Sequence, residues 1–262
     1  GDLLGHALAR LENSIPAVQT NIFGRLDNPY ERQWVTHRLF ISWTSCVQAA
    51  ERRWMPLNTA FFKRQSVAVY PLDADDGADP EEIVTFRQRH GMHANDICFG
   101  RFSRPEPNKW ISLPIDSFKL ALRGNSNLRL LLQEPPPEVA RILKEGPHAD
   151  RFTILSATSD PQELRINQSA VDAVLHASKI GESFGYGVVE VMNYGKPAIA
   201  HSTPSYDQAQ IEMIRHGECG YIASTASTMA QAILKIANDA NHRKSLGQRA
   251  RQHVRSIADA TL

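Results

Sequence analysis

The sequence is poor in cysteine and in net charge. Its three cysteines, Cys46, Cys98 and Cys219, lie far apart and form no C-x-x-C spacing. They argue against a disulfide framework or a structural zinc site and favour a reducing, cytoplasmic setting. Lys and Arg number 29 against 28 Asp and Glu, so no overall field attracts the chain to nucleic acid or anionic lipid.

Long apolar runs are also missing. No stretch reaches the ~18 apolar residues of a membrane span, and Gly1–His6 lacks the basic region of a signal peptide. The 262 residues suffice for one large or two modest domains, at ~150 residues per domain. We expect a soluble protein with no transmembrane segment. A first residue of Gly in place of Met hints at processing or at a piece of a longer chain.

From residue 95 onward, short apolar runs alternate with helix-period segments, a pattern typical of βαβ units and a parallel sheet. A complete doubly wound domain is therefore expected over residues 95–262. The predicted strands are Asp96–Arg101, Leu128–Leu132, Phe152–Leu155, Asp172–His176, Pro197–His201 and Gly220–Ala223. The predicted helices are Ile115–Leu122, Pro137–Glu145, Pro161–Gln168, Phe184–Tyr194 and Tyr206–His216, with two amphipathic helices through Met229–Ile236 and Leu246–Ile257.

The first part of the chain reads as an incomplete unit over residues 1–72. Its pattern predicts a helix at Leu3–Leu11 and strands at Ala17–Asn21, Arg38–Trp43 and Ser66–Tyr70. A linker and an entry helix are expected over residues 73–94, because Pro71–Pro80 is turn-rich and acidic. Asp73-Ala74-Asp75 imitates the D-x-D metal motif, but its place in this linker favours a solvated hinge.

The most informative stretch is Gly181–Pro197, which follows a predicted strand and runs into a helix. Gly185 and Gly187 free the turn, so that backbone N–H groups at the helix start can approach a phosphate. Glu182 and Glu190 then lie on either side of this turn, in the crevice where open α/β sheets bind ligands. A carboxylate there can accept two hydrogen bonds from a vicinal diol such as a ribose. The simpler alternative is that Glu182 is a solvated loop acid and that Glu190 only complements the helix dipole.

This stretch resembles the motif E-x-F-G-x-x-x-x-E-A-M-x-x-G-x-P of the retaining glycosyltransferases of family four, with Val191 in place of the usual Ala. The resemblance implies an α/β protein of the GT-B type. It also implies transfer of a hexosyl-type sugar from a nucleoside-diphosphate sugar with retention of configuration. The first Glu of the motif, here Glu182, lies near the transferred sugar, and the second, Glu190, binds the nucleotide ribose. The remaining residues expected to cradle the phosphate or sugar are Ser183, Phe184, Gly185 and Tyr186.

A second stretch, from Gly100-Arg101 to Lys109, is similar to the family's Gly-Arg…Lys segment, whose Arg and Lys neutralise the donor diphosphate. An Arg fork and a Lys point charge at the end of a strand can meet the charge that develops on a departing diphosphate. Lys109 is the firmer assignment, while Arg101 and Arg104 compete for the other role. The alternative is that these are ordinary surface basic residues.

The early half of the family's first domain has no counterpart, so a fragment or shortened member, inactive alone, is expected. No metal and no cofactor is predicted beyond the donor substrate. A nucleotide-sugar binding module without transfer activity and, more distantly, a GT-A-type metal enzyme remain alternatives. The acceptor, whether a glycan, a lipid-linked sugar or a small molecule, and peripheral membrane contact stay open. Asn167-Gln168-Ser169 fits the glycosylation pattern, although nothing indicates secretion.

Overall fold

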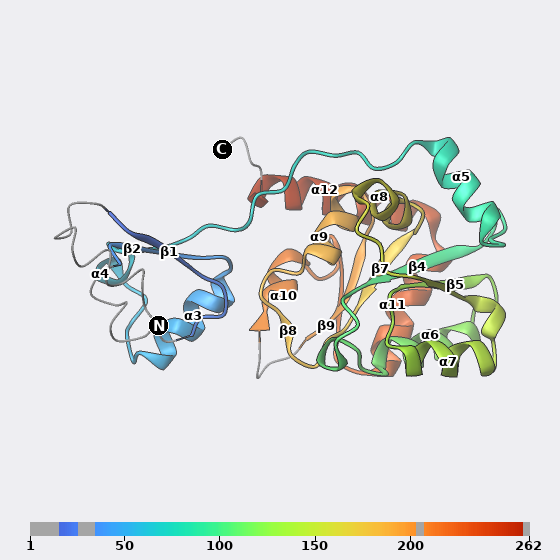
Figure 1. The fold of residues 1–262 in the computed structure, drawn as a ribbon, viewed down its shortest axis with the longest axis horizontal. Helices are drawn as coiled ribbons and strands as arrows, with labels where there is room; N and C mark the ends of the chain where they lie inside the picture. The colour runs from blue at the N-terminus through green and yellow to red at the C-terminus, as the bar shows by residue number, and fades with distance from the viewer. Residues whose placement is uncertain (1–15, 26–34, 203–206, 259–262) are drawn as a thin grey trace.

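The computed structural model describes residues 16–25, 35–202 and 207–258. It contains a three-stranded parallel sheet near the start of the chain and a six-stranded parallel sheet after it (Figure 1). An extended segment connects the two sheets. The small sheet has the order β1-β2-β3, with strands β1 (Val18–Asn21), β2 (His37–Phe40) and β3 (Gln65–Val67).

The six-stranded sheet has the order β11-β9-β7-β4-β5-β6. When the six strands are renumbered in chain order and read from the β6 edge, their order is 3-2-1-4-5-6. This is a doubly wound order. Its switch point lies between the first and fourth strands, β4 and β7. All six predicted strands of this domain are confirmed. Their bounds are β4 (Ile97–Phe102), β5 (Leu128–Gln133), β6 (Phe152–Leu155), β7 (Ala173–His176), β9 (Ala198–His201) and β11 (Gly220–Ala223).

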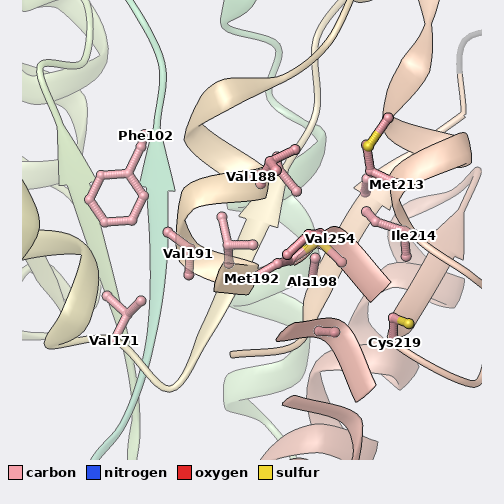
Figure 2. Close-up of a cluster of buried hydrophobic side chains, with 14 of the residues drawn as sticks. Phe102, Val171, Val188, Val191, Met192, Ala198, Met213, Ile214, Cys219 and Val254 are labelled. Carbon is pink, nitrogen blue, oxygen red and sulfur yellow. The ribbon is translucent and has the colours of Figure 1, made fainter. Parts of the chain in front are cut away.

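Helices cover both faces of this sheet, which is why its strands are buried apolar runs. One face carries α5 (Pro80–Arg89), α8 (Pro161–Ser169), α9 (Tyr186–Asn193) and α12 (Ala240–Ala258). The other carries α6 (Leu113–Leu122), α7 (Pro137–Glu145) and α11 (Ala226–Asn238). Figure 2 shows part of the first layer, with Val188, Val191 and Met192 of α9 near Val254 of α12. Within the described ranges no helix is long and apolar enough to cross a membrane.

The first part of the chain departs from the sequence prediction after β2. The strand predicted over Arg38–Trp43 ends at Phe40, and helix α3 (Trp43–Arg52) follows, with α4 (Thr59–Phe62) before β3. The start of α3 is fixed by a capping box in which the side chains of Ser42 and Ser45 each bond the other's backbone N–H. The sequence pattern did not indicate this capping box, because its third helical position holds Ser45 in place of the usual Glu or Gln. The helix predicted at Leu3–Leu11 lies outside the described residues.

Two predicted helices near the glycine-rich stretch are shorter than expected. α9 begins at Tyr186, two residues after the expected start, because Gly185 adopts the left-handed conformation with φ of 91° and ends the turn. Of the helix expected over Tyr206–His216, the described residues 207–216 contain α10 (Ala209–Met213). The preceding residues, Asp207–Gln208, form β10, which pairs in parallel with β8 (Gly181–Glu182).

The segment between β3 and α5 is tied to the large domain and is not the solvated hinge that the sequence suggested. The backbone N–H of Leu72 donates to Ala258, the last residue of α12. Asp75 pairs with Arg165 of α8 at 3.1 Å, and Asp76 pairs with Arg255 of α12 at 2.8 Å. Both acidic side chains therefore link this strap, residues 68–79, to α8 and α12. The backbone of the strap runs along these helices (Figure 1).

The close approach of α12 to the end of α9 yields a test of this packing. A Cβ on residue 247 would collide with the backbone carbonyl of Gly195, and a carbonyl at a helix end cannot move as a side chain can. Gly247→Ala is expected to lower the free energy of unfolding by about 1–3 kcal/mol, measured by urea denaturation. The exposed neighbour offers a control, Gln248→Ala, which should change it by less than about 0.5 kcal/mol. Equal effects of the two substitutions would contradict this packing.

Candidate active site

A cavity of about 510 Å³ lies beyond the carboxyl ends of β4, β5 and β7, beside the switch point of the large sheet. This is the place where doubly wound sheets bind their ligands. Eight of the nine residues predicted from the sequence line it. They are Arg104, Lys109, Glu182, Ser183, Phe184, Gly185, Tyr186 and Glu190.

The glycine-rich turn brings the start of α9 to the cavity wall. Gly185 precedes α9 with a φ of 91°, a conformation that favours glycine. A Cβ on Gly187 would lie 2.7 Å from the carbonyl oxygen of Phe102, so the absence of a side chain allows α9 to pack directly against the end of β4. As a result, the first N–H groups of an eight-residue helix lie at the cavity, where they favour an anion.

Glu182 is held by two partners at the base of the cavity. Its Oε2 accepts a hydrogen bond from Lys109 Nζ at 2.8 Å, and its Oε1 lies 3.2 Å from His176 Nε2. Burial alone would raise the pKa of Glu182, but the contacts with His176 and Lys109 outweigh it and lower that pKa to about 2. Glu182 is therefore a carboxylate at neutral pH.

His176 ends β7 and lines the same cavity. Burial lowers its pKa, and the neighbouring Glu182 carboxylate opposes this shift without reversing it. The ring is therefore neutral at pH 7, and its Nε2 lies close to the carboxylate without a hydrogen bond of good geometry. The sequence placed this histidine at a strand end near Glu182, but nothing in the sequence indicated the contact between them.

Glu190 occupies a different environment. It lies in the second turn of α9, and its Oε2 accepts a hydrogen bond from Gln168 Nε2 at 2.6 Å. Burial raises the pKa of Glu190, and the Gln168 contact only partly offsets this. No cation pairs with Glu190 among the residues that the structure describes.

The structure separates the two competing arginines. Arg101 is buried in β4 and does not line the cavity. Its Nη2 donates to the backbone carbonyls of Lys109 and Ala177. Its guanidinium carbon lies 4.4 Å from the ring centroid of Trp110. Burial lowers the pKa of Arg101 to about 10, with Glu182 acting against the shift, so it stays charged. Arg104 is the arginine at the cavity, where it is exposed and pairs with Glu106 at 3.2 Å.

Several lining residues have no counterpart in the sequence prediction. Tyr70 reaches the cavity from the strap, where its ring stacks on Tyr186 with centroids 5.6 Å apart. Glu134, directly after β5, adopts a φ of 49°, which is unusual for a residue other than glycine and occurs often at functional sites. The remaining polar residues on the wall that the sequence prediction did not single out are Ser103, Gln133, Thr158 and Gln168.

Comparison with known proteins places the chain in a family. Residues 85–253 match the model of Glycosyl transferases group 1. The chain belongs to this family. A probable sucrose-phosphate synthase of Thermosipho melanesiensis is 26% identical over 142 residues, which cover 52% of this chain and 33% of that protein. The chain thus spans about a third of the length of this curated relative.

Solved structures agree on the fold. HepE of Anabaena, in complex with UDP-glucose, superposes with a TM-score of 0.77 at 19% identity, over 98% of this chain and 72% of that one. The sucrose-phosphate synthase of Thermosynechococcus elongatus gives a TM-score of 0.71 at 17% identity, over 97% of this chain and 67% of that one. The predicted GT-B fold is confirmed.

The pairing of Glu182 makes stability depend on pH in a predictable way. Its folded-state pKa of about 2 lies below the value of about 4.3 for an exposed glutamate. The carboxylate therefore stabilises the folded state above pH ~4.3, and this contribution is lost as the pH falls towards 2. Glu182→Gln is expected to cost about 2 kcal/mol at pH 6, and the difference from the parent should shrink between pH 5 and pH 3.

Urea denaturation at a series of pH values measures this difference. Glu145→Gln serves as the control, because Glu145 forms an exposed ion pair with Arg141, and such pairs contribute little. A cost of Glu182→Gln that is the same at pH 6 and pH 3 would contradict the assigned pairing.

Proposed function

We propose that the chain carries the donor site of a glycosyltransferase that transfers a sugar from a UDP-sugar to an acceptor with retention of configuration. The observation that supports this most directly is the shared cavity. Its lining combines cations and helix N–H groups with two carboxylates in different electrostatic environments. HepE of Anabaena was solved with UDP-glucose, which supports uracil as the base and a hexose as the sugar.

The diphosphate is assigned to the cationic part of the cavity. Lys109, Arg104 and the start of α9 line one region, and each favours a phosphate oxygen. When the bond between the sugar C1 and the diphosphate oxygen breaks, negative charge grows on that oxygen, and these groups stabilise it. Arg101 contributes indirectly. Its Nη2 donates to the backbone carbonyl of Lys109, and its own positive charge adds to that of Lys109.

The two glutamates are assigned to hydroxyl groups of the donor. Glu182 is ionised, so it accepts hydrogen bonds from sugar hydroxyls and does not serve as a proton donor at neutral pH. Glu190 lines the part of the cavity that extends towards Gln168 and Leu164, where the ribose diol would meet it. No metal is assigned to the site, because protein cations can neutralise the diphosphate.

UDP is expected to raise the melting temperature of the chain by several degrees, because a ligand at 100 times its dissociation constant adds about 2.7 kcal/mol. EDTA should leave this shift unchanged. Glu190→Gln should remove most of it, whereas Glu138→Gln, an exposed acid on α7 away from the cavity, should keep it. Stabilisation by UDP that persists in Glu190→Gln, or that disappears with EDTA, would contradict the assigned site.

The stereochemical part of the proposal has its own test. Any glucosylated product formed from UDP-α-glucose is expected to be α-linked when it is examined by ¹H NMR, since retention follows from the match of Glu182 and Glu190 to the family motif. A β-linked product would overturn retention. The non-catalytic alternative predicts that UDP-glucose binds and that neither hydrolysis nor transfer occurs. Any turnover that Glu182→Gln abolishes would exclude this alternative.

A further inference from the structure

The last turn of α8 contains three consecutive buried polar residues, Asn167, Gln168 and Ser169, each 1–2% exposed. They form the Asn-Gln-Ser pattern that reads as a glycosylation site in the sequence. Burial excludes that use in the folded chain. Three polar side chains in a row on the buried side of a helix are costly unless each is bonded.

Each of the three makes a hydrogen bond to a different element. Asn167 Nδ2 donates to Gln133 Oε1 at the end of β5, at 2.9 Å. Gln168 Nε2 donates to Glu190 Oε2 on α9, at 2.6 Å. Ser169 Oγ accepts from the backbone N–H of Ala78 on the strap, at 2.9 Å. Only Gln168 therefore touches a residue to which the proposed function gives a role in binding.

The Gln168 contact limits what the Glu190 carboxylate can do. A carboxylate accepts through two oxygens, and here one of them is occupied by a neutral donor. Within the described part of the chain no protein group bonds the other oxygen, Oε1. The carboxylate is thus oriented by one hydrogen bond and keeps acceptor capacity for a ligand in the cavity that it lines.

We propose that Gln168 is a positioning residue that orients the Glu190 carboxylate to accept both hydroxyls of the ribose of the nucleotide donor. The inference rests on the proposed function, because it takes Glu190 as the ribose ligand. A neutral amide suits this role. A lysine or arginine would pair with the carboxylate and compete with the diol, whereas an apolar residue would leave a buried carboxylate without an orienting donor.

Two ligands separate positioning from general structural support. UDP carries the ribose diol, and 2′,3′-dideoxy-UDP lacks it while keeping the base and the diphosphate. The parent chain is expected to bind UDP more tightly than the dideoxy analogue in isothermal titration calorimetry. Gln168→Leu should raise the Kd of UDP about tenfold, as expected for a lost hydrogen bond to a charged group, and leave the Kd of the dideoxy analogue unchanged.

Ser169→Ala is the matched control, because it removes one hydrogen bond from the same buried turn without touching Glu190. It should preserve both affinities. If Gln168→Leu does not fold, as judged by circular dichroism, Gln168→Met removes the same donor with a longer, more adaptable side chain, and the same pair of affinities is expected from it.

The outcomes are distinguishable. An equal loss of affinity for UDP and for the dideoxy analogue in Gln168→Leu or Gln168→Met would assign Gln168 a structural role and overturn the inference. Unchanged UDP affinity in these variants would overturn it as well. If the parent binds the dideoxy analogue as tightly as UDP, the ribose role of Glu190 and this inference both fail. If the parent binds neither, the proposed donor site itself is wrong.

Discussion

A carboxylate that is largely removed from water is costly unless cations or hydrogen-bond donors stabilise it, and at Glu182 this requirement organises the edge of the large sheet. The side chain of Glu182 is 15% exposed, and its two oxygens meet Lys109 and His176. These partners come from the segment after β4 and from the end of β7, the two strands that flank the switch point. An uncompensated charge at this depth would cost several kcal/mol. The pairing therefore fixes three chain segments relative to one another before any ligand binds, and the cavity takes its shape from that arrangement.

The same edge is linked to the first part of the chain, including the strap. Beside the cavity, Tyr70 of the strap stacks on Tyr186 at the start of α9. Farther along, the carboxylate of Glu212 on α10 accepts from the backbone N–H of Trp43 at 2.8 Å and from Thr44, at the start of α3. A carboxylate at a helix N-terminus is favourable for the dipole as well as for the unpaired N–H groups. Because the first link contains a cavity residue, the position of the strap and the shape of the cavity depend on each other.

Local patterns were enough to predict the six strands of the large sheet, and most of the residues singled out as candidates line one cavity. The six buried strands are readable as apolar runs, and the rule that ligands bind at the carboxyl ends of parallel strands brought Lys109, Glu182 and Glu190 to one place in advance. Local patterns did not predict which side chains from distant segments contact one another. Arg101 and Arg104 lie three residues apart, and only the fold shows that the first turns into the sheet while the second reaches the cavity. The partnership of Gln168 with Glu190 depends on the packing of α8 against α9, which no local spacing encodes.

The two glutamates illustrate how one fold gives the same side chain two tasks. His176 and Lys109 lower the pKa of Glu182 despite its burial, whereas burial raises the pKa of Glu190, whose partner is the neutral amide of Gln168. Under the proposed function, an entering diphosphate would compete with Glu182 for Lys109, and Glu182 would then gain acceptor capacity for a sugar hydroxyl. Glu190 pairs with no cation among the described residues, so the same competition would not act on it. These separate environments are the basis for proposing that the ribose and the sugar are recognised by separate interactions within one cavity.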